Sequence, residues 1–292
     1  MKEITVEVIK QLREQTGVGM MDCKKALIEA NGDIEAAAEV LRKKGIAVAA
    51  KRSDNETNNG RVAASVANGA GALVEIACET DFAANTEDMG KFADLVAGHV
   101  ASTNAALDPE TILEQTSAGS KLSIKENLDE LISKITESIR IKRFARYAVE
   151  HGVVNAYIHP GASIGVMIAL ETNSELSDDQ KSKLATVAKD VCMHIAVMNP
   201  LCIDSDGIPA DTLAKEQEII KEQLRQSGKP EAMLDKIMVG KLRKYYEEIC
   251  LINQKFIKND KQSIGDYVTS SAKEVGVESV TVKAFVRYGI GR

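Results

Sequence analysis

The stretch Ala72-Leu73-Val74-Glu75-Ile76-Ala77-Cys78-Glu79-Thr80-Asp81-Phe82-Ala83-Ala84-Asn85 joins an apolar segment to a helical pattern. Residues 72–78 are typical of a strand, and Met89–Val96 has helical periodicity. Asp81 and Phe82 therefore lie on the connection between the two. A phenyl ring at this place has two explanations: it packs back into the core, or it is presented to a partner as an apolar wedge.

Length and composition indicate a globular protein with more than one domain. The chain has 292 residues, of which 44% are apolar, which is enough for two or more cores. With 43 acidic and 37 basic residues its net charge is −6, which argues against a nucleic-acid partner or an anionic membrane. The first residues are charged and no apolar run approaches the ~20 residues of a membrane span, so we expect a cytoplasmic protein.

The chain has few signs of a metal or cofactor site. Its five cysteines are scattered and never form a Cys-x-x-Cys pair, so neither a disulfide framework nor a zinc site is expected. The sequence also lacks a Gly-x-x-x-x-Gly-Lys-Ser/Thr loop, and Gly69-Ala70-Gly71 precedes a strand instead of opening a helix. We therefore expect no metal and no cofactor.

Residues 1–50 predict a small module of three helices, at Ile4–Gln15, Met21–Ala30 and Asp33–Lys44. Glycines mark its turns, and the third helix is expected to stop at Gly45. So small a unit buries little surface, which indicates a recognition module or one that leans on a partner. The polar stretch 51–60 that follows is predicted to be a linker.

The middle of the chain contains an internal repeat, so the predicted fold class is α+β with two related antiparallel core subdomains. A hairpin around Asn68-Gly69, the segment Glu79-Thr80 and a helix form the first copy; two strands, Glu171-Thr172 and a helix ending near Cys192–Ala196 form the second. The second copy has Asn173-Ser174 where the first has Asp81-Phe82. This asymmetry favours a function for the acid and the ring. The predicted subdomains are 61–145, and 146–205 with 254–292.

Residues 206–253 predict an inserted helical hairpin. Leu213, Ile220 and Leu224 mark one arm, apolar residues recur at alternating spacings of four and three on the other, and Ser227–Pro230 is expected to make the turn. The pattern is typical of an antiparallel coiled coil that projects from the core and could join two copies of the chain. A simple pair of packed helices explains it equally well.

The residues allow two other functions to be considered, a thiol enzyme and an RNA-binding protein. A thiol enzyme would use Cys78, Asp81 and His99, but nothing near Cys78 predicts an activated thiol, and we expect no enzymatic activity. An RNA-binding protein would use the interleaved basic and aromatic residues of Ile139–Tyr147, but their alternation suits a sheet strand with one charged face, and the net negative charge of the chain argues against RNA. The histidines show no metal-ligand spacing; His194, on an apolar helix end stopped by Pro200, is the one for which we expect a partner contact.

Two long motifs carry a resemblance to a known family. Thr16-Gly17-Val18-Gly19-Met20-Met21-Asp22-Cys23-Lys24-Lys25-Ala26-Leu27, followed by Glu29–Glu35, closely resembles the N-terminal signature of translation elongation factor Ts. Glu79-Thr80-Asp81-Phe82 resembles the second signature of that family. The order of module, duplicated core, inserted coiled coil and closing strand also matches, so the resemblance covers essentially the whole chain.

The resemblance implies a guanine-nucleotide exchange factor for the GTPase elongation factor Tu, with an N-terminal module similar to ubiquitin-associated domains. Thr80, Asp81, Phe82 and Ala83 would form the loop that disturbs the Mg²⁺ site of the GTPase, and the family usually has valine at the position of Ala83. Two further sets of residues would contact the partner: Val18, Gly19 and Met20 in the module, and His194, Ile195 and Met198 at the end of a helix.

The alternative function is a non-catalytic adaptor or chaperone that binds polypeptides through its three-helix module. An exchange factor accelerates GDP release from the GTPase, whereas an adaptor binds without changing that rate.

Overall fold

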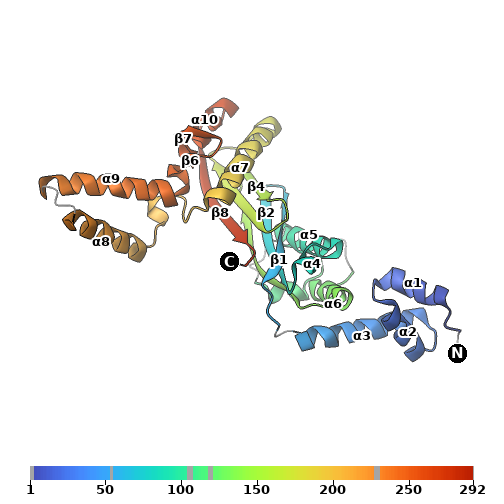
Figure 1. Cartoon of the computed structure of the whole chain (residues 1–292). Helices are drawn as coiled ribbons and strands as arrows, with labels where there is room; N and C mark the ends of the chain where they lie inside the picture. The colour runs from blue at the N-terminus through green and yellow to red at the C-terminus, as the bar shows by residue number, and fades with distance from the viewer. Residues whose placement is uncertain (1–2, 53–54, 104–107, 118–120, 227–230, 292) are drawn as a thin grey trace.

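The computed structural model describes residues 3–52, 55–103, 108–117, 121–226 and 231–291. It shows a mixed fold of helices and antiparallel sheets, as the sequence predicts (Figure 1). The core lies in the middle of the molecule, between the N-terminal helices and a helical hairpin that extends away from it (Figure 1). Within the described residues, no helix is both long enough and apolar enough to cross a membrane.

Three helices form the N-terminal module: α1 (Val6–Thr16), α2 (Met20–Glu29) and α3 (Ile34–Arg52). Thr5 caps α1, and Gly17 ends it in the left-handed conformation with φ 68°. The three helices share a small core of Ile9, Leu12, Val18, Cys23, Ala26, Leu27, Ala37 and Leu41. The predicted three-helix organisation is therefore present.

The third helix is longer than predicted because Gly45 does not end it. A Cβ atom at Gly45 would lie 2.7 Å from the Cβ of Ser133, so the glycine lets α3 approach α6 (Ile124–Ile135) closely. Lys51 and Arg52, expected in the linker, belong to α3, while Asn59 and Gly60 already begin the first strand. The module is thus joined to the core by helix packing as well as by the chain.

The first core subdomain is a three-stranded antiparallel sheet in the order β1-β2-β3, covered by helices. Asn68 and Gly69 make the predicted turn, both with positive φ. Besides α6, its elements are β1 (Asn59–Ala67), β2 (Ala70–Cys78), α4 (Asp81–Ala84), α5 (Glu87–Ser102), the 3-10 helix η1 (Thr111–Glu114) and β3 (Ile139–Ala148).

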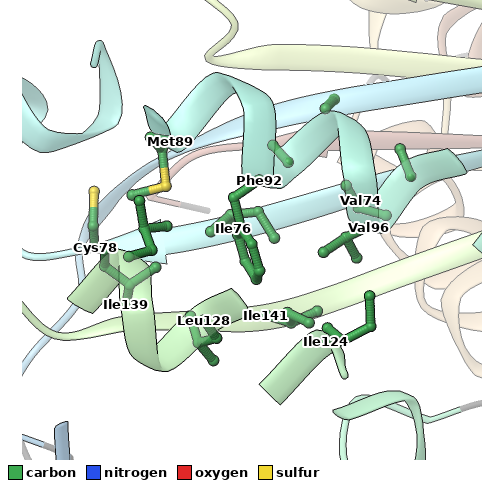
Figure 2. Packing of buried hydrophobic residues seen from close by; sticks show 14 of the residues in the cluster. Val74, Ile76, Cys78, Met89, Phe92, Val96, Ile124, Leu128, Ile139 and Ile141 are labelled. Carbon is green, nitrogen blue, oxygen red and sulfur yellow. The ribbon is translucent and has the colours of Figure 1, made fainter. Parts of the chain in front are cut away.

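The helices of this subdomain pack on one face of its sheet. Figure 2 shows Val74 and Ile76 of β2 facing Phe92 and Val96 of α5, with Leu128 of α6 in the same cluster. Cys78 at the end of β2 and Met89 in the first turn of α5 belong to the same cluster (Figure 2). Both ends of the short connection that holds α4 are therefore anchored in the core.

The second core subdomain repeats the arrangement, with a sheet in the order β4-β5-β8. It lacks a counterpart of α4, because Asn173 and Ser174 form a bend after β5. Its elements are β4 (Gly152–Ile158), β5 (Ile164–Thr172), α7 (Asp178–Met198), the 3-10 helices η2 (Ser205–Gly207) and η3 (Leu251–Asn253), β6 (Lys255–Phe256), β7 (Asn259–Ser263), α10 (Ile264–Val275) and β8 (Val280–Gly289).

The two sheets pack against each other through a separate apolar layer that includes Val62, Leu73, Val154, Met167, Ala169 and Tyr288. Polar contacts cross the same layer. The hydroxyl of Tyr147 donates to the carbonyl of Phe285 at 2.9 Å, and the guanidinium of Arg143 lies 4.4 Å from the ring centre of Tyr288. The core is thus two sheets between two layers of helices.

The predicted insertion is a hairpin of α8 (Ala210–Gln226) and α9 (Glu231–Ile249). The two helices lie side by side (Figure 1); Lys241 Nζ donates to the side chain of Gln223, and Ile220 and Leu224 of α8 are buried. At the base, Cys202 and Cys250 form a backbone bridge. The predicted turn at Ser227–Pro230 lies outside the described residues.

Candidate partner-binding site

Phe82 is the most exposed of the large apolar side chains in the described part of the chain, with 83% of its surface accessible. The explanation that its ring packs into the core is therefore wrong: the ring is exposed, as presentation to a partner requires. The next aromatic residue, Phe92, is only 5% exposed and belongs to the core. We therefore expect the ring of Phe82 to contribute little to the stability of the fold.

Phe82 lies on a helix of one turn, which the sequence pattern did not predict. Thr80 is its N-cap, and the Thr80 hydroxyl accepts a hydrogen bond from the amide of Ala83 at 3.2 Å. Because a helix this short is unstable by itself, its conformation depends on surrounding contacts.

The main contact comes from Glu137, between α6 and β3. Its Oε1 accepts from the Thr80 hydroxyl at 2.7 Å and its Oε2 from the Thr80 amide at 3.0 Å. In return, Glu79 Oε1 accepts from the amide of Ser138 at 2.6 Å. Sequence reasoning missed Glu137, because it lies 57 residues after Thr80 and no local pattern connects them.

The far end of α4 is also held. Ala83 and Ala84 are buried against the sheet, and Arg61 Nη1 donates to the carbonyl of Ala84 at 3.2 Å. The side-chain amide of Asn85 donates to the carbonyl of Asp81 at 2.9 Å. Contacts at both ends therefore hold the backbone of α4, while the ring of Phe82 points away from the core.

Asp81, which precedes Phe82, is the other exposed residue of α4. Among the described residues, its carboxylate takes part in no hydrogen bond or ion pair. A free carboxylate and a phenyl ring are thus presented side by side on one short element. Such a pair can combine apolar contact with a negative charge aimed at a cation of a partner.

The structure does not assemble the thiol dyad that an enzyme would need. Cys78 donates its thiol proton to the carbonyl of Thr80, and burial raises the pKa of that thiol to about 11. His99 lies in the last turn of α5, where its Nε2 is 2.8 Å from Oε1 of Gln115. Cys78 and His99 therefore have separate partners.

The basic residues of Ile139–Tyr147 lie on β3, as the strand interpretation predicts. Lys142 and Arg143 pair with the buried carboxylate of Glu75, and Arg146 donates to the carbonyl of Ala101. These charges serve contacts within the protein. The RNA-binding interpretation therefore loses most of its support.

The predicted contact residues of the module lie on the turn between α1 and α2 and at Met20, the first residue of α2. Gly19 is exposed and Met20 is partly exposed, whereas Val18 is buried in the module core, which contradicts its direct contact with a partner. Gly17 lies against the stem of Lys134, whose Nζ is 2.7 Å from Asp88 Oδ1 at the start of α5. The turn is therefore linked through Lys134 to the helix that follows α4.

At the end of α7, only part of the predicted contact surface is exposed. His194 and Ile195 are fully buried, which contradicts direct contact with a partner, while Met198 is 43% exposed. The side chain of His194 is close-packed because Phe256 and Gln254 lie beside it. Val197 and Leu201, also exposed, extend the surface at Met198.

The buried imidazole of His194 is neutral. The amide of Ile257 donates to its Nδ1 at 3.3 Å, so the proton resides on Nε2, which lies 2.9 Å from Oε1 of Gln254. Burial lowers the pKa of His194, and the bond to Gln254 opposes that shift. The residue supports the end of α7 from inside, as a satisfied structural histidine.

Comparison with known proteins agrees with the two sequence motifs. The family model described as Elongation factor TS matches residues 79–292. Elongation factor Ts of Clostridium botulinum is 41% identical over 99% of this chain and 92% of its own length; that of Clostridium perfringens is 44% identical over 99% and 93%. The chain therefore belongs to the elongation factor Ts family of translation elongation factors.

Proposed function

We propose that this translation elongation factor binds the GDP form of elongation factor Tu and promotes the exchange of GDP for GTP. The observation that carries the proposal is the exposed Phe82 beside the free carboxylate of Asp81 on a firmly held α4. Membership of the elongation factor Ts family supports the choice of partner. The chain itself makes or breaks no covalent bond in this proposal and uses no cofactor.

The proposed mechanism follows from reciprocal coupling of two ligands. If the factor weakens GDP binding to the GTPase, GDP weakens binding of the factor by the same ratio. A weakening of 10⁴-fold requires about 5.5 kcal/mol of contacts that exist only in the opened state of the GTPase. Burying one phenyl ring contributes roughly 2–3 kcal/mol, so Phe82 acts together with other contacts.

The two residues of α4 have different roles in this proposal. Phe82 enters the GTPase as an apolar wedge and separates elements around the nucleotide. Asp81 disturbs the ligands of the Mg²⁺ ion that neutralises the phosphates of GDP, and loss of the ion weakens nucleotide binding. The turn at Gly19 and Met20 and the surface at Met198 supply docking contacts that precede this step.

Stopped-flow release of labelled GDP from elongation factor Tu tests the proposal directly. We expect the chain to accelerate release, and Phe82→Ala to lower the maximal rate more than it weakens docking. Val66, another exposed apolar residue, provides the control: Val66→Ala should leave both quantities unchanged. Equal loss of rate and docking for Phe82→Ala, or no loss of rate, would contradict the wedge.

The same measurement decides the adaptor alternative. An adaptor or chaperone that binds through residues 1–50 would form a complex without changing the rate of GDP release. An exchange factor raises that rate in proportion to its occupancy of the GTPase.

A further inference from the structure

We infer that Glu137 is a positioning residue that holds α4 ready for binding, an inference that rests on the proposed exchange function. Three features of the connection between α6 and β3 carry it: the two hydrogen bonds from Thr80, the return bond from Ser138 to Glu79, and the backbone conformation at Thr136.

Two atoms of Thr80, its amide nitrogen and its hydroxyl oxygen, donate hydrogen bonds to the carboxylate of Glu137. The Thr80 hydroxyl donates to Glu137 and at the same time accepts from the amide of Ala83, so one oxygen links the carboxylate to the first turn of α4. Hydrogen bonds to a charged acceptor are shorter and stronger than bonds between neutral groups. Glu137 therefore stabilises both the N-cap of α4 and the direction in which the chain enters it.

The bond from Ser138 to Glu79 runs in the opposite direction between the same two segments. The carboxylate of Glu79 accepts from the backbone amide of Ser138, and the carboxylate of Glu137 accepts from the backbone amide of Thr80. Two chain segments that are distant in sequence are thereby held side by side. A rotation of α4 away from the core would break bonds at both segments.

Thr136 turns the chain toward this contact. It ends α6 with φ 61°, a left-handed conformation that a β-branched residue rarely adopts, and its amide bonds to the carbonyl of Ile132 at 2.8 Å. The sharp turn brings Glu137 next to Thr80 immediately after the helix. A relaxed helix end would direct the following residue elsewhere.

This arrangement explains how Phe82 can be both exposed and fixed. Its ring gains little from the core, and α4 buries only two alanines, so apolar packing alone holds the element weakly. The carboxylate of Glu137 supplies the missing restraint. A restrained wedge loses less conformational entropy when it enters a partner than a mobile one does.

Hydrogen exchange in the free protein tests the restraint without any partner. In Glu137→Ala, the amides of Ala83, Ala84 and Asn85 should exchange faster by about 10- to 100-fold. Glu114→Ala, which removes an exposed glutamate from the same subdomain, should leave them unchanged. Unchanged protection in Glu137→Ala would overturn the inference, even if the exchange function proves correct.

Release of labelled GDP tests the consequence. The maximal rate with Glu137→Ala should fall by about five-fold or more, while the concentration for half-maximal effect changes by less than about two-fold. Thr80→Val, which removes the hydroxyl, should slow release, and Thr80→Ser, which keeps it, should be faster than Thr80→Val. Thr80→Val combined with Glu137→Ala should be no slower than the slower single variant, because both act through one contact.

The outcomes separate this inference from the proposed function. If the wild-type chain does not accelerate GDP release, the exchange proposal fails, and hydrogen exchange alone decides the role of Glu137. If Glu137→Ala lowers the unfolding temperature and weakens rate and docking equally, the residue supports the fold in general and the inference is wrong.

Discussion

At the scale of single residues, exposure separates residues that stabilise the fold from those available to a partner. Phe82 and Phe92 have the same side chain and lie ten positions apart, yet one is 83% and the other 5% exposed. The first is presented on α4, and the second fills the core between α5 and the sheet. A residue's chemistry alone does not reveal which of the two roles it has.

Substitution of the two phenylalanines should therefore give opposite results. We expect Phe92→Ala to reduce the free energy of unfolding by about 3–5 kcal/mol, because it leaves a cavity in a packed core. Phe82→Ala should change it by less than about 0.5 kcal/mol, since the ring contacts little. Urea unfolding followed by circular dichroism measures both, and similar losses would contradict the assignment.

His194 should make stability depend on pH. Its pKa is lowered in the folded protein, so the unfolded chain, with a pKa near 6.5, takes up a proton first as pH falls. The stability that depends on the neutral ring of His194 is fully present above about pH 6.5. Below that pH it declines by at most about 1.4 kcal/mol per pH unit, until the pKa of His194 in the folded protein is reached. Above that range the neutral ring keeps its bonds to Ile257 and Gln254.

Urea unfolding at several values between pH 5 and 8 checks this dependence. His194→Gln should remove the part of the decline that comes from the buried ring. His159→Gln, at an exposed position, is the control and should retain the decline. If His194→Gln and the wild type lose stability in parallel, the ring is not responsible.

At the scale of elements, the turn between α1 and α2 and the end of α6 form one contact. Gly17 ends α1 with φ 68°, and a Cβ atom there would lie 2.2 Å from Cε of Lys134. Lys134 pairs with Asp88 of α5, so the module, α6 and α5 meet at one side chain. The glycine of the signature motif is needed both for the turn and for this contact.

Gly17→Ala and Gly19→Ala form a matched pair of tests. Alanine at Gly17 requires a left-handed conformation, which costs roughly 1–2 kcal/mol, and displaces Lys134. Gly19 has φ −58° and no atom within 4 Å of an added Cβ, so Gly19→Ala should cost less than about 1 kcal/mol. Thermal unfolding of the module measures both, and equal losses would count against the contact with Lys134.

At the scale of the whole molecule, the helical hairpin is an attachment to a core that is complete without it. The hairpin meets the core at its base, where Cys202 and Cys250 form a backbone bridge beside Ile208, Leu213 and Tyr245. The rest of α8 and α9 extends away from the sheets (Figure 1). Its apolar seam includes Ile220 and Leu224, which contribute to the stability of the hairpin itself.

Trimming the hairpin should leave the core intact. Removal of residues 216–242, with a short glycine-serine loop between the shortened helices, keeps the base cluster and should change the unfolding of the core by less than about 1 kcal/mol. GDP release should persist, because Phe82 lies in the other subdomain. A complete loss of release would show that the hairpin is part of the exchange machinery.

The same variant tests the prediction that two copies join through the hairpin. If the full chain is a dimer in size-exclusion chromatography with light scattering, the trimmed chain should be a monomer. A dimer that survives trimming would place the contact elsewhere.

By itself, the sequence determined the local structure of this protein. Periodicity predicted the three N-terminal helices, the strand that leads to Cys78 and the inserted helical hairpin. Asn68-Gly69 predicted the hairpin turn, and the unequal repeat singled out Asp81-Phe82. These features follow from neighbouring residues, whose spacing decides conformation directly. The two motifs also resembled the elongation factor Ts family, and the matches to known proteins then showed that the chain belongs to it.

Only the tertiary structure decided which side chains meet. Gly45, expected to end a helix, lies inside α3, where it lets Ser133 come close. His194, expected to contact a partner, is buried beside Gln254, and Glu137 bonds to Thr80 from 57 residues away. Each depends on contacts between elements that are distant in the chain. Such contacts leave no local pattern, because packing, and not spacing, brings the residues together.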